Sequence, residues 1–496
     1  MGELGASVSL VAILPEVALV LGAVLVLLVD VTWKPDLRVH AILAAASIAG
    51  AAGGLLAQWL EIYPDTEGIA GAQGAFPIFA YSDMVVIDPE SILFRAGVVA
   101  ITAIGTVFAW RLIRRLGRKG AEALALVLIA SSGFLFMVSA GHFMMLFLGL
   151  EVGSISLYVL AGISNEHKES DEAAMKYFLL GSVASAIFLY GVALLYTATG
   201  TMTYAGTRGF LLSLGDQIVF RPAIFPLAVG LILVGFLFKI GAAPFHAWAP
   251  DVYQGAPAGI TGYMSAVAKV AAIGAILRMA FVPFSGLVDT WQAPLAGVAA
   301  VSVVVGTLYA VVQSDLRRIL AYSGVAHAGF LLVGVATGTT GSARGVAFYV
   351  LTYVIVLAAA FGIVGAVSGA SSSGSPLDAY RGLSKSSPGA AASLSVLMLA
   401  LAGMPVTSGF VAKFGVFTAA WRGGFQWLVL VALVASVAAF AFYLRVIVLM
   451  YFEEGDGPEV ELSLGTRIST AVVLILTIGL GVYPTPLLEL IDRAFF

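Results

Sequence analysis

The stretch that decides the fold is residues 231–257, which read Leu-Ile-Leu-Val-Gly-Phe-Leu-Phe-Lys-Ile-Gly-Ala-Ala-Pro-Phe-His-Ala-Trp-Ala-Pro-Asp-Val-Tyr-Gln-Gly-Ala-Pro. Lys239 lies late in an apolar run of membrane-spanning length, and Pro244 follows it. A charge near the centre of a bilayer costs about 2.5–3.5 kcal/mol even on a lenient insertion scale. Such a lysine is tolerated where it faces a protein interior or a hydrated path. The stretch therefore predicts a membrane protein that handles charge inside the bilayer.

The composition of the whole chain agrees with this interpretation. Its 496 residues are 60% hydrophobic and 11% charged, whereas a soluble domain carries roughly 25% charged residues. The net charge of −3 gives no reason to expect nucleic-acid binding. The chain has no cysteine, which excludes disulfides and thiolate zinc sites and removes the usual ligands of iron–sulfur clusters. It also has no dinucleotide turn or phosphate-binding loop, so redox or nucleotide chemistry would have to occur on another chain.

Apolar runs long enough to span a bilayer recur along the sequence and predict an all-α polytopic protein with about fourteen transmembrane helices. The run at 388–422 is too long for one straight span and contains Pro405, so we expect a broken helix there, as at Pro244. The first run continues into an interfacial ending, which favours a retained helix over a signal peptide. The expected runs are 9–30, 39–60, 89–110, 121–140, 142–164, 171–199, 222–248, 256–282, 292–313, 317–337, 345–369, 388–422, 426–452 and 465–491.

Basic loop residues predict the orientation, because cytoplasmic loops carry an excess of Lys and Arg. The densest cluster, 111–119, follows the third span and is expected in the cytoplasm. Both termini would then lie outside, and residues 61–88 would form an acidic external loop. Residues 371–376, Ser-Ser-Ser-Gly-Ser-Pro, are the one flexible linker signal.

The spacing of the interrupted helices also suggests an internal repeat. One block of five helices covers about 121–282 and a second covers about 292–452, and the fourth helix of each carries a proline and a lysine. An odd number of helices requires the second block to be inverted, which is a recurring design in transporters. We therefore divide the chain into three N-terminal helices (1–120), two inverted repeats with broken helices 7 and 12 (121–290 and 291–455) and a C-terminal helix (456–496).

Glu151 is the acidic group expected near the middle of the membrane, because it lies about ten residues into its helix. Pairing with Lys239 is the natural hypothesis, since a nearby cation favours the carboxylate. The alternative is a static salt bridge that ties two helices together. Buried basic groups outnumber buried acids in this sequence, which weighs against that alternative.

Lys269 and Lys413 repeat the pattern of a cation within an apolar helix. Lys269 is surrounded by small residues, which leave room for water, and a desolvated lysine suits a proton relay. The alternative for Lys269 is snorkelling of its side chain toward the interface. Lys413 follows Pro405 and two glycines, and this interruption suggests a hydrated cavity beside the lysine.

Two histidines and three arginines have weaker signals. His327 lies among Ser and Tyr residues and would suit proton passage, although simple hydrogen bonding explains it equally well. His246 lies five residues before an aspartate, but no spacing collects three ligands, so a metal site is not expected. Arg445 keeps its charge and would set the local electrostatic potential. Arg95, like Arg278, is expected near a helix end as an anchor.

The motifs around these residues resemble those of the antiporter-like subunits of proton-pumping NADH:quinone oxidoreductase, respiratory complex I. The resemblance covers nearly the whole chain, and the segment 249–255, Ala-Pro-Asp-Val-Tyr-Gln-Gly, is most similar to N-type subunits. A lysine rather than a glutamate at position 413 differs from M-type subunits. One departure is 406–408, Val-Thr-Ser, where many relatives have a second proline. The matching segments are 150–151, 238–257, 265–269, 315–329 and 401–414.

The resemblance implies a role for each of these residues. Glu151 and Lys239 would form a charge pair, Lys269 would connect the two halves, and Lys413 would be the exit-side proton site, with His327 as part of the relay. The resemblance also implies partner chains that carry NADH, FMN, iron–sulfur clusters and quinone, with no cofactor on this chain. An M-type antiporter-like subunit and small K- and J-type subunits would be neighbours in a bacterial inner membrane.

Three other functions remain open from the sequence. Subunits of cation/proton antiporters share these motifs, and so do the related chains of membrane-bound hydrogenases. A purely structural membrane scaffold is the third alternative, and it predicts that neutralising Lys239 or Lys269 leaves proton flux intact.

Overall fold

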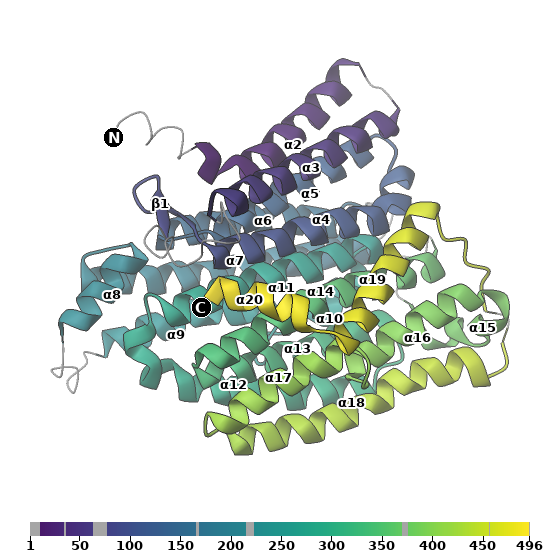
Figure 1. Cartoon of the computed structure of the whole chain (residues 1–496). Coiled ribbons are helices and arrows are strands. Elements are labelled where there is room, and N and C mark those ends of the chain that lie inside the picture. Colours follow the sequence, from purple (N-terminus) through teal and green to yellow (C-terminus); the bar gives the residue numbers. More distant parts are fainter. Residues whose placement is uncertain are drawn as a thin grey trace.

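The computed structural model of the chain describes residues 10–33, 36–62, 77–164, 168–214, 223–369, 375–455 and 457–495. It is a bundle of helices (Figure 1), so the predicted all-α membrane class is confirmed. In this described part, 12 helices are long and apolar enough to cross a membrane. They are α2 (Leu14–Thr32), α3 (Leu37–Ile62), α4 (Pro89–Arg115), α5 (Lys119–Val138), α6 (Phe143–Ala161), α7 (Lys168–Thr199), α11 (Ala258–Phe281), α12 (Val288–Val311), α13 (Leu316–Thr337), α14 (Thr340–Ser368), α18 (Gln426–Phe452) and α19 (Leu464–Val482).

Two further pairs of shorter helices are interrupted where the sequence predicts breaks. The first pair is α9 (Ile224–Ile240) with α10 (Trp248–Gly255), and the second is α16 (Pro388–Ala402) with α17 (Ser408–Arg422). Gly241 ends α9 at φ 73° and Gly403 ends α16 at φ 88°, a left-handed conformation that glycine adopts without a steric penalty. Pro244 and Pro405 lie within the two breaks. The total of about fourteen spans and the inverted repeat stay predictions.

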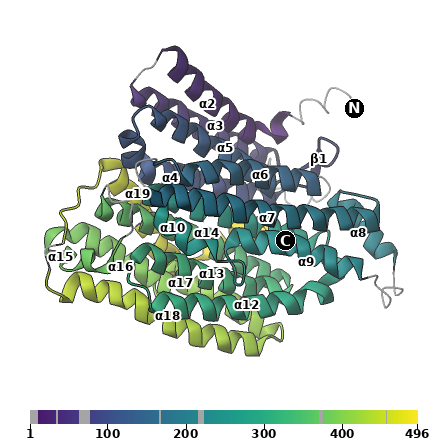
Figure 2. The ribbon, with the colours of Figure 1, turned by 180° about the vertical axis from the view of Figure 1, so that it is seen from behind.

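The centre of the bundle is formed by α11 and α13, whose side chains are almost all buried. Figures 1 and 2 show α2 and α3 at one edge of the bundle and α12 and α18 at the other. The peripheral helices α2, α3 and α19 expose most of their apolar side chains, as expected for surfaces that face lipid. The two central helices carry Lys269 and His327.

The helix ends define two opposite ends of the bundle. We call one the hairpin end, because it carries the antiparallel strands β1 (Ile78–Ala80) and β2 (Val85–Ile87) together with α8 (Tyr204–Ser213). We call the other the basic end, because it carries the basic residues of 111–119 at the turn from α4 to α5. The short elements η3 (Leu377–Tyr380) and α15 (Leu383–Ser386) also lie at the basic end, and η2 (Ser285–Leu287) precedes α12.

Two sequence predictions fall largely outside the described residues. These are the acidic loop at 61–88, of which residues 63–76 are not described, and the linker at 371–376, of which residues 371–374 are not described.

The C-terminal segment differs from the single helix expected at 465–491. It forms α19 and then α20 (Thr485–Phe495), with Tyr483 and Pro484 between them. Proline cannot donate the backbone hydrogen bond that would continue α19. In Figure 1 the two yellow helices cross one face of the bundle, and α20 contacts α4 and α14. The ion pair of Arg344 with Asp492 holds α20 there at 2.7 Å.

Candidate functional site

Lys239 is buried in the last turn of α9, with 3% of the residue exposed. Its ammonium donates to the Ser154 hydroxyl at 2.7 Å and to the Tyr177 hydroxyl at 3.5 Å. The rings of Phe134, Tyr158 and Tyr177 lie with their centroids 5.4, 5.8 and 5.5 Å from the ammonium nitrogen. Hydroxyls and ring faces therefore hold this charge, and cation–π attraction is strongest in such desolvated settings.

Glu151 lies one helical turn before Ser154 on α6, so the two side chains share a face of the helix. The Ser185 hydroxyl of α7 donates to the Glu151 carboxylate. Glu151 and Lys239 interact electrostatically, but no ion pair at 4.0 Å or less joins them. Ser154 accepts from Lys239 and itself donates to the Leu150 carbonyl, so the described contacts do not join Glu151 to Lys239. The predicted charge pair and its role in transport stay predictions.

Lys269 is buried on α11, with 3% exposed, and is surrounded by aromatic rings and a glycine. The centroids of the Tyr253 and Tyr353 rings lie 5.8 and 5.7 Å from its ammonium nitrogen. A Cβ atom at Gly324 of α13 would lie 2.7 Å from the same nitrogen. The space that the ammonium occupies therefore depends on glycine at position 324.

His327 lies between two tyrosine hydroxyls inside the bundle. Its Nδ1 is 2.8 Å from the Tyr349 hydroxyl and its Nε2 is 3.2 Å from the Tyr443 hydroxyl, which also bonds to Ser323. Both ring nitrogens thus have a partner that can donate or accept a proton. The Tyr353 ring stacks on the imidazole with centroids 4.4 Å apart. Tyr353 therefore contacts both Lys269 and His327.

Lys413 belongs to α17 but reaches back to the end of α16, and 6% of it is exposed. Its ammonium donates to the Ala402 carbonyl at 2.7 Å and to the Ser436 hydroxyl at 3.0 Å. A cation at a helix C-terminus interacts favourably with the helix dipole. The Phe330 ring lies 4.9 Å from the ammonium nitrogen and 5.8 Å, centroid to centroid, from His327.

The three buried lysines share one property that bears on their chemistry. Within the part of the chain that the structure describes, no carboxylate lies within 4.0 Å of any of the three ammonium groups. A static salt bridge would require such a contact. The described contacts of these lysines are therefore hydrogen bonds and aromatic rings, and their role as a proton relay stays a prediction.

Comparisons with known proteins agree with this arrangement. Residues 140–439 match the family described as NADH:quinone oxidoreductase/Mrp antiporter, transmembrane. NADH-quinone oxidoreductase subunit N of Mycobacterium bovis is 44% identical over 394 residues, which cover 78% of this chain and 73% of that protein. The subunit N of Trichlorobacter lovleyi is 35% identical and covers 99% of this chain and 98% of that protein.

A solved structure extends the comparison to the fold. A chain of respiratory complex I from Thermus thermophilus with bound aureothin aligns at a TM-score of 0.78 with 32% identity, covering 96% of this chain and 98% of that one. The chain belongs to the N-subunit family of NADH-quinone oxidoreductase.

Two of the residues predicted for this N-type subunit lie away from the buried lysines. Arg445 is exposed on α18 and donates to the Gln313 carbonyl at 3.2 Å, and its expected effect on the local electrostatic potential stays a prediction. It lies near the end of a helix whose outer face is exposed. His246 is half-buried in the α9–α10 break, and its ring lies 6.2 Å from that of Tyr322. The role of His246 stays a prediction.

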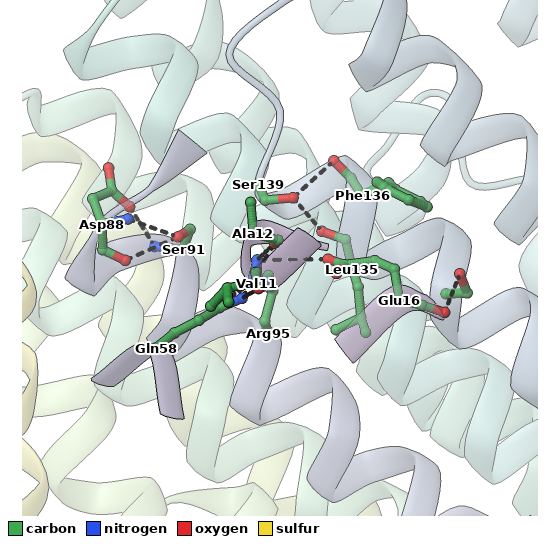
Figure 3. A network of polar contacts seen from close by, with 11 residues as sticks. Val11, Ala12, Glu16, Gln58, Asp88, Ser91, Arg95, Leu135, Phe136 and Ser139 are labelled. Carbon is green, nitrogen blue, oxygen red and sulfur yellow. Dashed lines mark hydrogen bonds and ion pairs between the residues drawn. The ribbon is translucent and has the colours of Figure 1, made fainter. Parts of the chain in front are cut away.

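A second buried polar cluster lies in the N-terminal helices, where we expected Arg95 to be an anchor near a helix end. Arg95 is instead fully buried on α4 and pairs at 3.6 Å with Glu16, which is also fully buried. Figure 3 shows Arg95 between Glu16 and Gln58, to which it also donates a hydrogen bond. This cluster joins α2, α3 and α4, because its three members come from these helices.

Arg278 forms a separate ion pair at the hairpin end of α11. It contacts both carboxylate oxygens of Asp88 at 2.7 and 2.8 Å and lies 3.3 Å from Glu90. Burial alone would raise the pKa of Asp88, but Arg278 and the hydrogen bonds from Ser91 together outweigh it and lower the pKa. Asp88 is also the N-cap of α4, so the same side chain fixes the start of one helix and the end of another.

Sequence reasoning missed the hydroxyl groups that surround the buried charges. Ser154 had a usable signal, because it lies three residues after Glu151 on the same helical face. The other hydroxyls come from helices that are distant in the sequence, and no local pattern marks them. They are Tyr177, Ser185, Tyr349, Tyr353, Ser436 and Tyr443.

Proposed function

We propose that the chain is the proton-translocating N-type subunit in the membrane arm of an NADH:quinone oxidoreductase. The observation that carries this proposal is the set of three buried lysines that have no carboxylate partner among the described residues, two of which are joined to His327 through aromatic contacts. A protein that only needed mechanical stability would gain nothing from three such charges. Membership of the N-subunit family supports the same function.

Protons would move along a series of polar side chains from Lys269 through His327 to Lys413, which we call the polar line. The bonds of His327 to Tyr349 and Tyr443 offer hydroxyl groups that can pass a proton on. We infer from the positive-inside rule that the basic end faces the cytoplasm and that both termini lie outside. Protons would then enter toward Lys269 and leave from Lys413 into the external space.

The charge pair of Glu151 and Lys239 offers a way to control this proton movement. Glu151 accepts from Ser185, and Lys239 donates to Ser154, one helical turn along α6 from Glu151, so side-chain rotation would bring the two charges into contact or separate them. Separation of the pair would weaken the hold of Lys239 on its proton, and that change in charge would act on Lys269. Coupling to the redox reaction would therefore be electrostatic.

The energy would come from partner chains, because this chain has no cysteine to hold an iron–sulfur cluster. NADH, FMN, iron–sulfur clusters and quinone are expected on those partners. We expect the M-type subunit and the small K- and J-type subunits as membrane neighbours in a bacterial inner membrane. The chain would thus act within a translocating enzyme and hold no redox centre of its own.

The second candidate function is cation/proton exchange, as in the antiporters that the matched family also includes. An antiporter or a membrane-bound hydrogenase would use the same lysines with a different driving force. Transport that needs sodium and proceeds without NADH would favour the antiporter.

The proposal is tested with the native complex reconstituted in vesicles and driven by NADH and quinone. Lys269→Ala should lower proton uptake per NADH oxidised, because it removes the central cation of the line. Lys385→Ala is the matched control, since Lys385 is an exposed lysine at the basic end. Unchanged proton uptake with Lys269→Ala would favour a scaffold, and sodium-dependent transport without NADH would favour the antiporter.

A further inference from the structure

A long apolar groove runs along the outside of the bundle between α3 and α4. Its volume is about 1020 Å³, and Ser463, Gly465 and Leu490 of the C-terminal segment line it from a third side. From Ile92 to Trp110, both of which line it, α4 rises by about 27 Å at 1.5 Å per residue. That length approaches the roughly 30 Å of a bilayer's hydrocarbon core. The groove is therefore long enough to run through most of the hydrocarbon core of a membrane.

The groove meets a second cavity at the basic end. This cavity has a volume of about 1010 Å³, and Trp110 and Ser463 line both spaces. Trp110 lies where the apolar lining changes to a charged one, and tryptophan prefers that depth of a membrane. The two spaces are thus adjoining compartments of opposite character, one apolar and one polar.

The lining of the second cavity is strongly basic. Six of its residues are Lys or Arg, and Glu461 is the one acidic residue among the described residues that line it. The basic residues are Arg111, Arg114, Arg115, Arg118, Lys119 and Arg317. Four of them, namely Arg111, Arg114, Arg115 and Arg118, are exposed and form no ion pair at 4.0 Å or less with any described residue. The cavity therefore offers positive charge to an anion from outside this chain.

We propose that the groove and the basic cavity together bind an anionic phospholipid, with its phosphate among the arginines and an acyl chain between α3 and α4. A basic pocket between transmembrane helices is the typical seat of such headgroups. The positive-inside rule explains a basic loop, but it does not explain why the basic cavity opens into an apolar groove. A transmembrane helix of a neighbouring subunit would fill the groove and leave the arginines without a partner. A single phospholipid would place its acyl chain in the groove and its phosphate in the basic cavity.

The test uses the native complex in nanodiscs that contain phosphatidylglycerol or phosphatidylcholine, each with the same photo-crosslinking acyl chain. Mass spectrometry then locates the labelled peptides. Phosphatidylglycerol should label α3 and α4 along the groove at least about fivefold more than phosphatidylcholine, because only its headgroup carries a net negative charge. The label should lie between Ala96 and Val107 of α4.

Two sets of variants separate the headgroup site from the groove. Exchange of Arg114, Arg115 and Arg118 for Gln should reduce labelling by phosphatidylglycerol to the level of phosphatidylcholine. Exchange of the exposed Lys168 and Lys385 for Gln, also at the basic end, should leave it unchanged. Ala103→Trp should block the groove for both lipids, since Ala103 lines it.

Two results would overturn the proposal. Equal labelling by the two lipids, unaffected by the arginine exchanges, would mean that the groove takes general bilayer lipid. No labelling of the groove in the assembled complex, with cross-links from a neighbouring subunit in its place, would mean that a protein helix covers it. Both results are independent of proton transport, so they leave the proposed function untouched.

Discussion

The Lys413 ammonium lies 2.7 Å from the carbonyl oxygen of Ala402, the last residue of α16. The Lys413 side chain belongs to α17 and thus caps the C-terminus of α16. The contact depends on the break at Gly403, because the left-handed turn there leaves the carbonyls at the end of α16 without a continuing helix. The buried position of the Lys413 ammonium therefore depends on the break between α16 and α17.

Ser154→Ala should slow proton pumping by about tenfold, because it removes the hydroxyl that accepts a hydrogen bond from the Lys239 ammonium. A hydrogen bond to a charged group contributes about 1.5–3 kcal/mol. The measurement is proton uptake and NADH oxidation by the reconstituted complex. Ser156→Ala is the matched control, since Ser156 is buried on the same helix and donates only to the Val152 carbonyl. Equal effects of the two exchanges would contradict a role of the Ser154–Lys239 hydrogen bond in proton pumping.

Tyr443→Phe and Tyr349→Phe should each lower proton pumping by about fivefold. Each removes one hydroxyl from a ring nitrogen of His327, and a neutral hydrogen bond contributes about 1 kcal/mol. Tyr263→Phe serves as the control, because Tyr263 is equally buried and bonds to Ser131 away from the lysines. Normal pumping by both Tyr443→Phe and Tyr349→Phe would contradict the proposal that His327 is part of the proton relay.

Gly324→Ala should impair pumping while the complex still assembles. The added Cβ would lie 2.7 Å from the Lys269 ammonium nitrogen, and the flexible lysine would have to move away. The same exchange at Gly297 of α12 is the control, since a Cβ there meets nothing within 4 Å. Pumping is compared after the melting temperatures of both variants are measured. Equal rates of proton pumping by Gly324→Ala and Gly297→Ala would show that pumping does not depend on the position of the Lys269 ammonium.

Breaking the Asp88–Arg278 pair should destabilise the protein by about 3–5 kcal/mol, because one buried charge is left without its partner. The double variant Asp88→Asn with Arg278→Gln should lose less than the sum of the two single variants. Thermal unfolding of the purified complex measures all three. Additive losses would show that the two side chains do not interact.

The pH dependence of that pair follows from the lowered pKa of Asp88. A lowered pKa in the folded state stabilises the protein above the unfolded pKa of about 4. This contribution is lost only as the pH falls through the folded value. Glu90 also lies 3.3 Å from Arg278, so the comparison is made in a Glu90→Gln background, which removes this second carboxyl group. There the difference in melting temperature between the protein with Asp88 and the one with Asp88→Asn should stay constant from about pH 8 to pH 5. A decline within that range would contradict the pKa direction.

Much of the fold could be predicted from the sequence, because membrane helices depend on long apolar runs. The breaks at Pro244 and Pro405 were predictable from proline and glycine, whose backbone limits are local. The division of the C-terminal segment at Pro484 follows the same rule and was overlooked within a long apolar run. The β-hairpin and α8 were not predicted, because short elements give no periodic signal.

Only the charged residues of the candidate site could be predicted from the sequence. Lys239, Lys269 and Lys413 are conspicuous in apolar surroundings, and all three are buried. Arg445 lies on the exposed face of α18, which the sequence does not indicate, since periodicity does not say which side of a wholly apolar helix faces the bundle. The hydroxyl partners depend on the packing of distant helices, which no local pattern determines.

The most direct test of the account is the ratio of protons moved to NADH oxidised in the reconstituted complex carrying Lys413→Ala, beside Lys385→Ala as the control. Lys413 is the last cation of the proposed line, and its removal should abolish pumping through this subunit. The account predicts a lower ratio for Lys413→Ala and an unchanged ratio for Lys385→Ala. A ratio equal to that of the native complex in the Lys413→Ala variant would contradict the account.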